Sequence, residues 1–146
     1  MGKVIDAEKI VLRDEAGNVR AVFGLQADGT PQLMLVGRTG HVRASIRLGE
    51  DDEPTISLAD RNGEPRAEFS VLANGVPGIN LFDTEGKTRG TFHVSPNGTP
   101  KLAMVDGRGN PRSVLCLFTD GRPLIEFFDD NKKTIFEAPS KSKFIA

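Results

Sequence analysis

The sequence contains no tryptophan and no tyrosine, so its nine phenylalanines are its only aromatic residues. Trp and Tyr dominate protein-binding hot spots, and aromatic side chains form the platforms on which single-stranded nucleic acid stacks. Charge of one sign is also missing, because the formal net charge is only -1. A basic surface for nucleic acid or anionic lipid therefore finds no support, and we expect neither as a partner.

Cysteine is scarce as well: Cys116 stands alone, so the chain cannot form an internal disulfide. No apolar run approaches membrane-spanning length, and the first residues lack the apolar core of a secretion signal. Phosphate-loop, Cys-x-x-Cys, His-Glu-x-x-His and nucleophile-elbow motifs are absent too. We therefore expect a cytoplasmic protein that is not an enzyme and that uses no cofactor or metal.

The sequence does contain one unit of 23 residues, which repeats without insertions or deletions. Three columns of residues recur in phase at this spacing. They are Gly17, Gly40, Gly63, Gly86 and Gly109; Pro31, Pro54, Pro77, Pro100 and Pro123; and Arg20, Arg43, Arg66, Arg89 and Arg112. A fixed period of this length indicates supersecondary units that stack on their neighbours.

Each unit carries two turn signals. Asn74-Gly75 is typical of a tight type I′ hairpin turn, in which both central residues have positive φ, and Asp28-Gly29 occupies the same slot of an earlier unit. The Asp-x-x-Gly pattern, as in Asp60 to Gly63, predicts a type I turn that a left-handed glycine closes. Asp51-Asp52 occupies the Asn-Gly slot of its unit without a glycine, so we expect that turn to be the most strained or the loosest.

Between the turns, apolar residues alternate with small or polar ones. Phe23 and Leu25 on one predicted strand, and Leu33 and Leu35 on the next, recur in every unit. This period of two predicts antiparallel strands with one buried and one wet face. We predict an all-β meander of eleven or twelve strands in a single domain, residues 1–146, with atypical caps at 1–9 and 139–146. A β-solenoid with parallel stacked strands is the alternative.

Eleven strands present an apolar face on the order of 1000 Å², more than the roughly 300–600 Å² that a soluble monomer exposes. The sheet must close as a flattened sandwich, wind into a prism, or pack against identical chains. We expect a homo-oligomer, a trimer or a dimer, in which the Phe23/Leu25 and Leu33/Leu35 columns carry assembly. Four late residues occupy positions that are polar in earlier units and are further assembly candidates: Val114, Cys116, Phe118 and Leu124.

The arginine column has two interpretations, a ladder that binds a polyanion or a set of local ion pairs with nearby carboxylates. The small net charge favours local pairs. The aspartate column similarly favours turns over calcium, because calcium-binding β-rolls need a denser glycine and aspartate pattern. The acidic cluster from Glu50 to Glu53 is interpreted as a solvated loop. His41, His93 and Cys116 have no supporting constellation for catalysis or metal binding, although His93 and Cys116 share a column.

The unit Asp-x-x-Gly-x-x-Arg-Ala-x-Phe-x-Leu-x-x-Asp-Gly-x-Pro-x-Leu-x-Leu resembles repeats of uncharacterised bacterial proteins, and it covers the chain from about Ile10 to Ile135. It is similar to MORN repeats, which serve as scaffolds and tethers, in length and hairpin character only, because the Tyr-x-Gly signature is absent. The sequence thus predicts a non-catalytic structural protein that self-assembles. The alternative is a module that binds another protein or a glycan through its polar face or an inter-chain groove.

Overall fold

The structure is a computed structural model that describes residues 4, 6–49 and 51–140. These residues form β-strands and turns and no helix, so they contain no helix that could cross a membrane. The chain divides into two compact units, Met1–Ala73 and Asn74–Ala146, which are described separately below. The predicted terminal caps, residues 1–9 and 139–146, lie partly outside the described residues. Glu50 also lies outside them.

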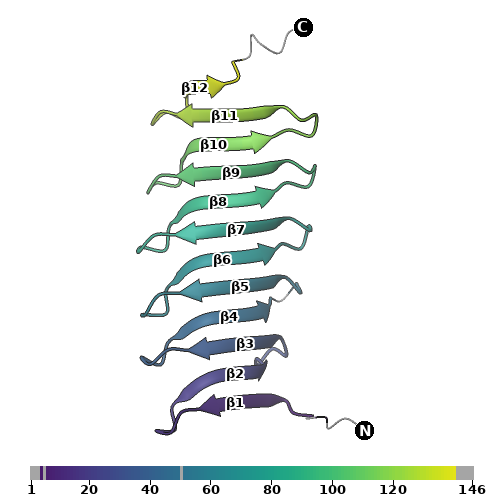
Figure 1. Ribbon diagram of the computed structural model, residues 1–146, viewed down its shortest axis with the longest axis vertical. Coiled ribbons are helices and arrows are strands. Elements are labelled where there is room, and N and C mark those ends of the chain that lie inside the picture. The colour runs from purple at the N-terminus through teal and green to yellow at the C-terminus, as the bar shows by residue number, and fades with distance from the viewer. Residues whose placement is uncertain (1–3, 5, 50, 141–146) are drawn as a thin grey trace. The chain divides into compact units, whose positions relative to one another are not determined.

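The first unit is a six-stranded antiparallel meander in which each strand pairs with the next along the chain (Figure 1). Its strands are β1 (Lys9–Arg13), β2 (Val19–Leu25), β3 (Pro31–Val36), β4 (Val42–Leu48), β5 (Pro54–Ala59) and β6 (Pro65–Val71). The strand lengths follow from the repeat, because a turn signal interrupts the alternating pattern every five to seven residues.

The second unit repeats this arrangement with the following six strands. They are β7 (Pro77–Phe82), β8 (Thr88–Val94), β9 (Pro100–Val105), β10 (Pro111–Leu117), β11 (Pro123–Phe128) and β12 (Thr134–Ala138). The predicted all-β meander is confirmed, and every pair is antiparallel, whereas a solenoid would stack parallel strands. Neither unit closes on itself, because its strands pair only with their neighbours in sequence, so neither adopts the sandwich-like or prism-like closure.

The two kinds of turn share one geometry. In the Asp-x-x-Gly turn the Gly63 N–H donates to the Asp60 carbonyl, and the Asp60 N–H donates to the Glu64 carbonyl. Asp28-Gly29 lies in a turn with the same two bonds, because Gly29 donates to Gln26 and Gln26 donates to Thr30. Only the glycine has positive φ there, so the type I′ prediction is wrong, and both turns are type I turns followed by a left-handed residue.

Two of these turns place a side chain where the others have glycine. Asp52 adopts a φ of 58° and Lys132 a φ of 63°, and they are the non-glycine residues with positive φ in the described part of the chain. Both amides keep the bond that closes the turn, to the carbonyls of Gly49 and Asp129. The strain predicted at Asp51-Asp52 is therefore located at Asp52, and the repeat imposes the same conformation on Lys132.

We predict that Asp52→Gly and Lys132→Gly each stabilise the protein by about 1 kcal/mol, because glycine adopts the left-handed region without steric strain. Lys132→Gly is expected to give the larger gain, since aspartate tolerates this region better than lysine does. The midpoint of urea unfolding measures both effects. A midpoint that falls in both variants would contradict the assignment of strain.

The face that carries Phe23, Leu25, Leu33 and Leu35, here called the repeat face, is not buried within the chain. Among the described residues, Val22, Ala103, Val114 and Cys116 alone form the buried apolar set, and strand alternation places all four on the opposite face. The apolar face is thus exposed within a single chain, and its burial against identical chains stays a prediction. The physical reason is that each unit has one layer, so nothing in the unit packs against the repeat face.

Candidate functional site: an exposed apolar face

A row of large apolar side chains crosses the middle of the repeat face in each unit. Strand register aligns one residue per strand, and we call this set the middle row. In the first unit it consists of Ile10, Phe23, Leu33, Ile46, Ile56 and Phe69. In the second unit it consists of Ile79, Phe92, Leu102, Leu115 and Ile125. The repeat is what keeps the row unbroken, because each 23-residue copy contributes two residues at a fixed register.

Two further rows flank the middle row and alternate in size. The turn-side row lies toward the Asp-x-x-Gly turns and, in the first unit, consists of Leu12, Ala21, Leu35, Ala44, Leu58 and Ala67. The proline-side row lies at the other ends of the strands, where Leu25 faces Pro31 and Leu48 faces Pro54. In the second unit Val94 faces Pro100 and Leu117 faces Pro123. Large and compact residues therefore alternate from strand to strand in both flanking rows.

The large apolar side chains of the repeat face are widely exposed. The middle-row residues listed above are 37–58% exposed, and the strand residues Leu12, Leu35 and Leu58 of the turn-side row are 51–59% exposed. The whole chain exposes 10531 Å², whereas a compact monomer of 15.8 kDa is expected to expose about 7,300 Å², a difference of about 3,200 Å². Each partner of an obligate homo-oligomer buries about 1,000–2,500 Å², so the difference for one chain is large enough to supply such an interface.

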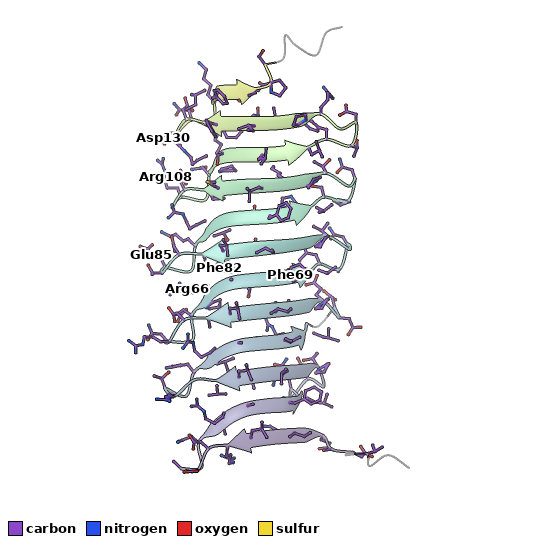
Figure 2. The ribbon with its side chains drawn as sticks, in the orientation of Figure 1. Arg66, Phe69, Phe82, Glu85, Arg108 and Asp130 are labelled. Atoms are coloured by element: carbon purple, nitrogen blue, oxygen red, sulfur yellow. The ribbon has the colours of Figure 1, made fainter. Side chains whose placement is uncertain are left out.

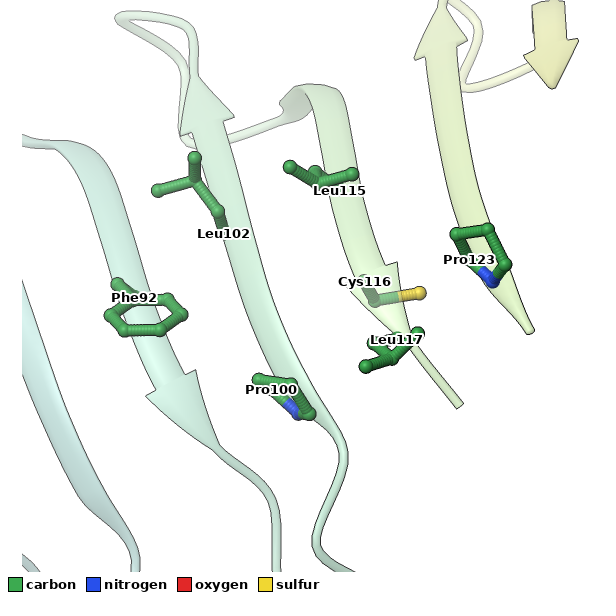
Figure 3. Close-up of a pocket in the computed structure, with 7 residues that line it drawn as sticks. All are labelled: Phe92, Pro100, Leu102, Leu115, Cys116, Leu117 and Pro123. Atoms are coloured by element: carbon green, nitrogen blue, oxygen red, sulfur yellow. The ribbon is translucent and has the colours of Figure 1, made fainter. Parts of the chain in front are cut away.

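On the second unit the repeat face is hollowed between β8 and β11 (Figure 3). The hollow has a volume of about 520 Å³, and its lining is Phe92, Pro100, Leu102, Leu115, Cys116, Leu117 and Pro123. No charged side chain contributes to this lining. The hollow is thus suited to apolar groups, and the Cys116 thiol is the one reactive group in its lining.

The four late assembly candidates come together on the opposite face of the same strands. Val114, Cys116, Phe118 and Leu124 line a second hollow of about 540 Å³. Val114 and Cys116 are only 7% and 8% exposed, while Phe118 remains 39% exposed. Lys101 and Glu126 also line it and supply one charge of each sign. Strands β9 to β11 therefore present apolar surface on both faces.

Each arginine of the repeated column occupies a β-bulge, a feature that the sequence pattern did not reveal. Arg13 pairs with Val19 and Leu12 pairs with Ala21, so Arg20 has no partner across the ladder. The same shift in register occurs at Arg43, Arg66, Arg89 and Arg112. An extra residue of this kind bends its strand and redirects its side chain. The column is thus fixed by backbone geometry beside the Asp-x-x-Gly turn.

The bulged arginines form local contacts at the turns. Arg66 donates from Nε to Asp60 Oδ2 over 3.0 Å, and Arg89 forms an ion pair with Asp83 over 3.3 Å. Arg112 donates to Asp130 over 2.6 Å, and Arg108 donates to the same carboxylate over 3.0 Å. Figure 2 shows Arg108 and Asp130 on the same side of the second unit. Two arginines of the column also donate to backbone carbonyls of the next strand. Arg43 Nε donates to the Ala59 carbonyl over 2.9 Å, and Arg89 Nε donates to the Val105 carbonyl over 2.8 Å. These contacts tie one turn to the next repeat.

The turn aspartates hold their own loops together. Asp83 Oδ1 accepts from the backbone N–H groups of Glu85 and Lys87, and Asp106 Oδ1 accepts likewise from Arg108 and Asn110. The Asn110 N–H is the main cause that lowers the pKa of Asp106. Burial is the largest single influence on Asp83 and raises its pKa, but the N–H bonds of Lys87 and Glu85 together with Arg89 outweigh it, so the pKa is lowered.

Other turn carboxyls are shifted in the same direction. The Arg66 hydrogen bond is the main cause that lowers the pKa of Asp60. The side-chain amide of Asn18 does the same for the pKa of Asp14. Backbone N–H groups of Thr30 and Arg122 lead the lowering of the pKa for Asp28 and Asp120.

We therefore predict that the protein loses stability in acid. A carboxyl whose pKa is lower in the folded state stabilises it above the unfolded pKa and loses that contribution as pH falls through the folded value. The ordinary aspartate pKa of 3.8 places the onset near pH 4, with further loss below it. Urea midpoints between about pH 7 and about pH 2.5 measure the effect, and Asp60→Asn with Asp106→Asn should flatten the curve. A parent midpoint that is constant across this range would contradict the prediction.

The remaining candidates do not form a reactive site. His93 and Cys116 both face Lys101 across the ladder, from β8 and β10, and so share a row with an amine between them. His41 lies in the first unit, against Gly63. Within the described residues no group of three or more His, Cys, Asp or Glu side chains is placed to hold a metal ion. Asp51 and Asp52 are exposed at their turn, and Glu53 accepts a hydrogen bond from the Ala73 N–H over 2.7 Å.

Several solved structures are similar to part of this chain, and two of them are structures of TarM. No family model and no curated protein sequence matches the chain. A structure of an S. aureus TarM mutant with fondaparinux, α-GlcNAc-glycerol and UDP aligns with 79% of this chain and 21% of that one, at 17% identity and a TM-score of 0.36. A second TarM structure aligns at 18% identity with the same TM-score. This chain spans about a fifth of their length, and at this TM-score the likeness assigns no function.

Proposed function

We propose that this is a non-catalytic structural protein that assembles into a homo-oligomer, a dimer or a trimer, through its repeat face. The observation that supports this most strongly is the middle row, which no part of its own unit covers. Because apolar burial contributes roughly 25 cal/mol per Å², leaving the apolar part of the chain's excess surface in water is a large loss of stabilisation. A second copy of the same chain supplies a matching apolar surface at the same concentration.

The second hollow belongs to the same proposal. A further contact between chains covers the opposite face of β9 to β11. The residues at or near this contact are Val114, Cys116, Phe118 and Leu124. The alternative function, recognition of another protein, is favoured by the same hollow, because Lys101 and Glu126 flank an apolar floor. Binding of a glycan through the polar face has no comparable feature behind it.

Phe118→Glu tests the contact proposed at the second hollow, because an unpaired carboxylate buried at an apolar contact is costly. Light scattering after size-exclusion chromatography should give the parent a multiple of 15.8 kDa and the variant a smaller or aggregated species. Thr119→Glu is the matched control, since it adds the same charge at the adjacent exposed position outside the hollow. If both variants keep the parent's mass, this hollow is not an assembly contact, and the binding function takes precedence for it.

A further inference from the structure

The flanking rows of the repeat face have a pattern that makes the face complementary to itself. On the even strands of the first unit the turn-side residue is Ala and the proline-side residue of β2 and β4 is Leu. On the odd strands the turn-side residue is Leu and the proline-side residue of β3 and β5 is Pro. Each strand therefore carries one large and one compact residue, and the order reverses from one strand to the next.

We infer that two copies pack repeat face against repeat face, related by a two-fold axis that runs along the direction of strand stacking. This inference rests on the self-assembly proposed above. This rotation exchanges the turn-side and proline-side rows and leaves each strand opposite its own counterpart. Leu25 and Leu48 of one copy then lie over Ala21 and Ala44 of the other. The turn-side leucines of the odd strands lie over prolines, so large residues meet compact ones in both flanking rows, while the middle row meets its own counterpart.

Exposure agrees with this interdigitation. Leu35 and Leu58 are 51% and 53% exposed, because their neighbours on the row are alanines. In the middle row, where large residues lie on both sides, exposure runs from 37% at Leu33 to 58% at Phe23. The turn-side leucines therefore project beyond a surface with a notch at every second strand, about 10 Å apart. Face-to-face sheets that interdigitate pack about 10 Å apart in the aligned arrangement.

The second copy is the occupant because the pattern fits it without any lateral shift and because the excess area is of obligate size. Each unit pairs with the same unit of its partner, so the packing uses only geometry inside a unit. The second unit keeps the pattern over Leu81, Gly90, Met104 and Ser113. It departs from the pattern at Phe136, which stacks on Phe127 with ring centroids 5.2 Å apart. This last pair closes the row at the end strand.

A pair of complementary variants tests the arrangement. The first variant, Ala21→Leu with Ala44→Leu, fills two notches, so its homodimer places leucine against leucine. The second variant, Leu25→Ala with Leu48→Ala, removes the opposing side chains, so its homodimer contains voids. In a mixed dimer the new leucines face the new alanines and the other half of each contact is native. We expect each variant alone to dissociate at least about 10-fold more readily than the parent, and the co-expressed pair to form a heterodimer of parental affinity.

The outcomes separate this inference from the assembly proposal. A monomeric parent removes both. A parent that assembles, with a notch-filling variant that assembles equally well, overturns the face-to-face arrangement and leaves self-assembly standing. Co-expression keeps the test decisive if the first variant does not fold alone, because a heterodimer then supports the arrangement and its absence contradicts it. The heterodimer is measured by light scattering after purification on a tag carried by one variant only.

Discussion

Ile46→Glu is expected to dissociate the oligomer and to remove most of the stability of the fold. Ile46 lies in the middle row, paired with Leu33 and Ile56, so a carboxylate there would be enclosed by apolar groups in the assembled protein. An unpaired buried charge costs about 3–5 kcal/mol, which corresponds to roughly 100- to 4,000-fold weaker association for each copy of the site.

Ser45→Glu is the matched control for this substitution. It adds the same charge at the adjacent position of β4, where alternation directs the side chain to the opposite face. Sedimentation velocity and urea unfolding of both variants measure the difference. An Ile46→Glu variant that sediments and unfolds like Ser45→Glu would show that the repeat face stays in water.

The second large effect is expected at the turn glycines. Gly86 has a φ of 75°, and a Cβ there would meet nothing within 4 Å, so Gly86→Val isolates backbone strain and should cost about 1–3 kcal/mol. Gly63 has a φ of 87°, and its added Cβ would lie 3.2 Å from the Cβ of His41. Gly63→Val should therefore destabilise the protein more than Gly86→Val does.

Two further variants separate strain from contact. His41→Ala in the Gly63→Val background should reduce its cost to that of Gly86→Val, because the close neighbour is removed. Asn in place of either glycine should cost less than Val, since Asn tolerates the left-handed region. Urea midpoints measure all of these. Equal midpoints for Gly63→Val, Gly86→Val and the parent would show that these turns do not need glycine.

The sequence predicted the strands and both turn positions, because the period of two indicates extended strands and the phased glycines mark positions of positive φ. It did not predict that Arg20 and its counterparts are bulged, since a bulge changes register by one residue without changing composition. The type I′ interpretation of Asp28-Gly29 was wrong for a similar reason. Gly29 needs positive φ in either kind of turn, and only the loop length distinguishes them.

The candidate site was predicted in part. The apolar columns marked the repeat face, and the late apolar residues marked the hollow that holds Val114 and Phe118. Alternation alone gives the two faces of a strand but not the number of layers, so it could not show that Phe23 and Leu33 stay exposed within the chain. The size alternation of the flanking rows became visible only once the register aligned Leu35 with Ala21 and Ala44.

Sedimentation equilibrium of the unmodified protein from nanomolar to high micromolar concentration tests self-assembly most directly. The account predicts a mass of two or three times 15.8 kDa at micromolar concentration, with twice this value for the face-to-face arrangement, and loss of cooperative unfolding where dilution releases single chains. A mass of 15.8 kDa at every concentration, together with cooperative unfolding, would contradict it.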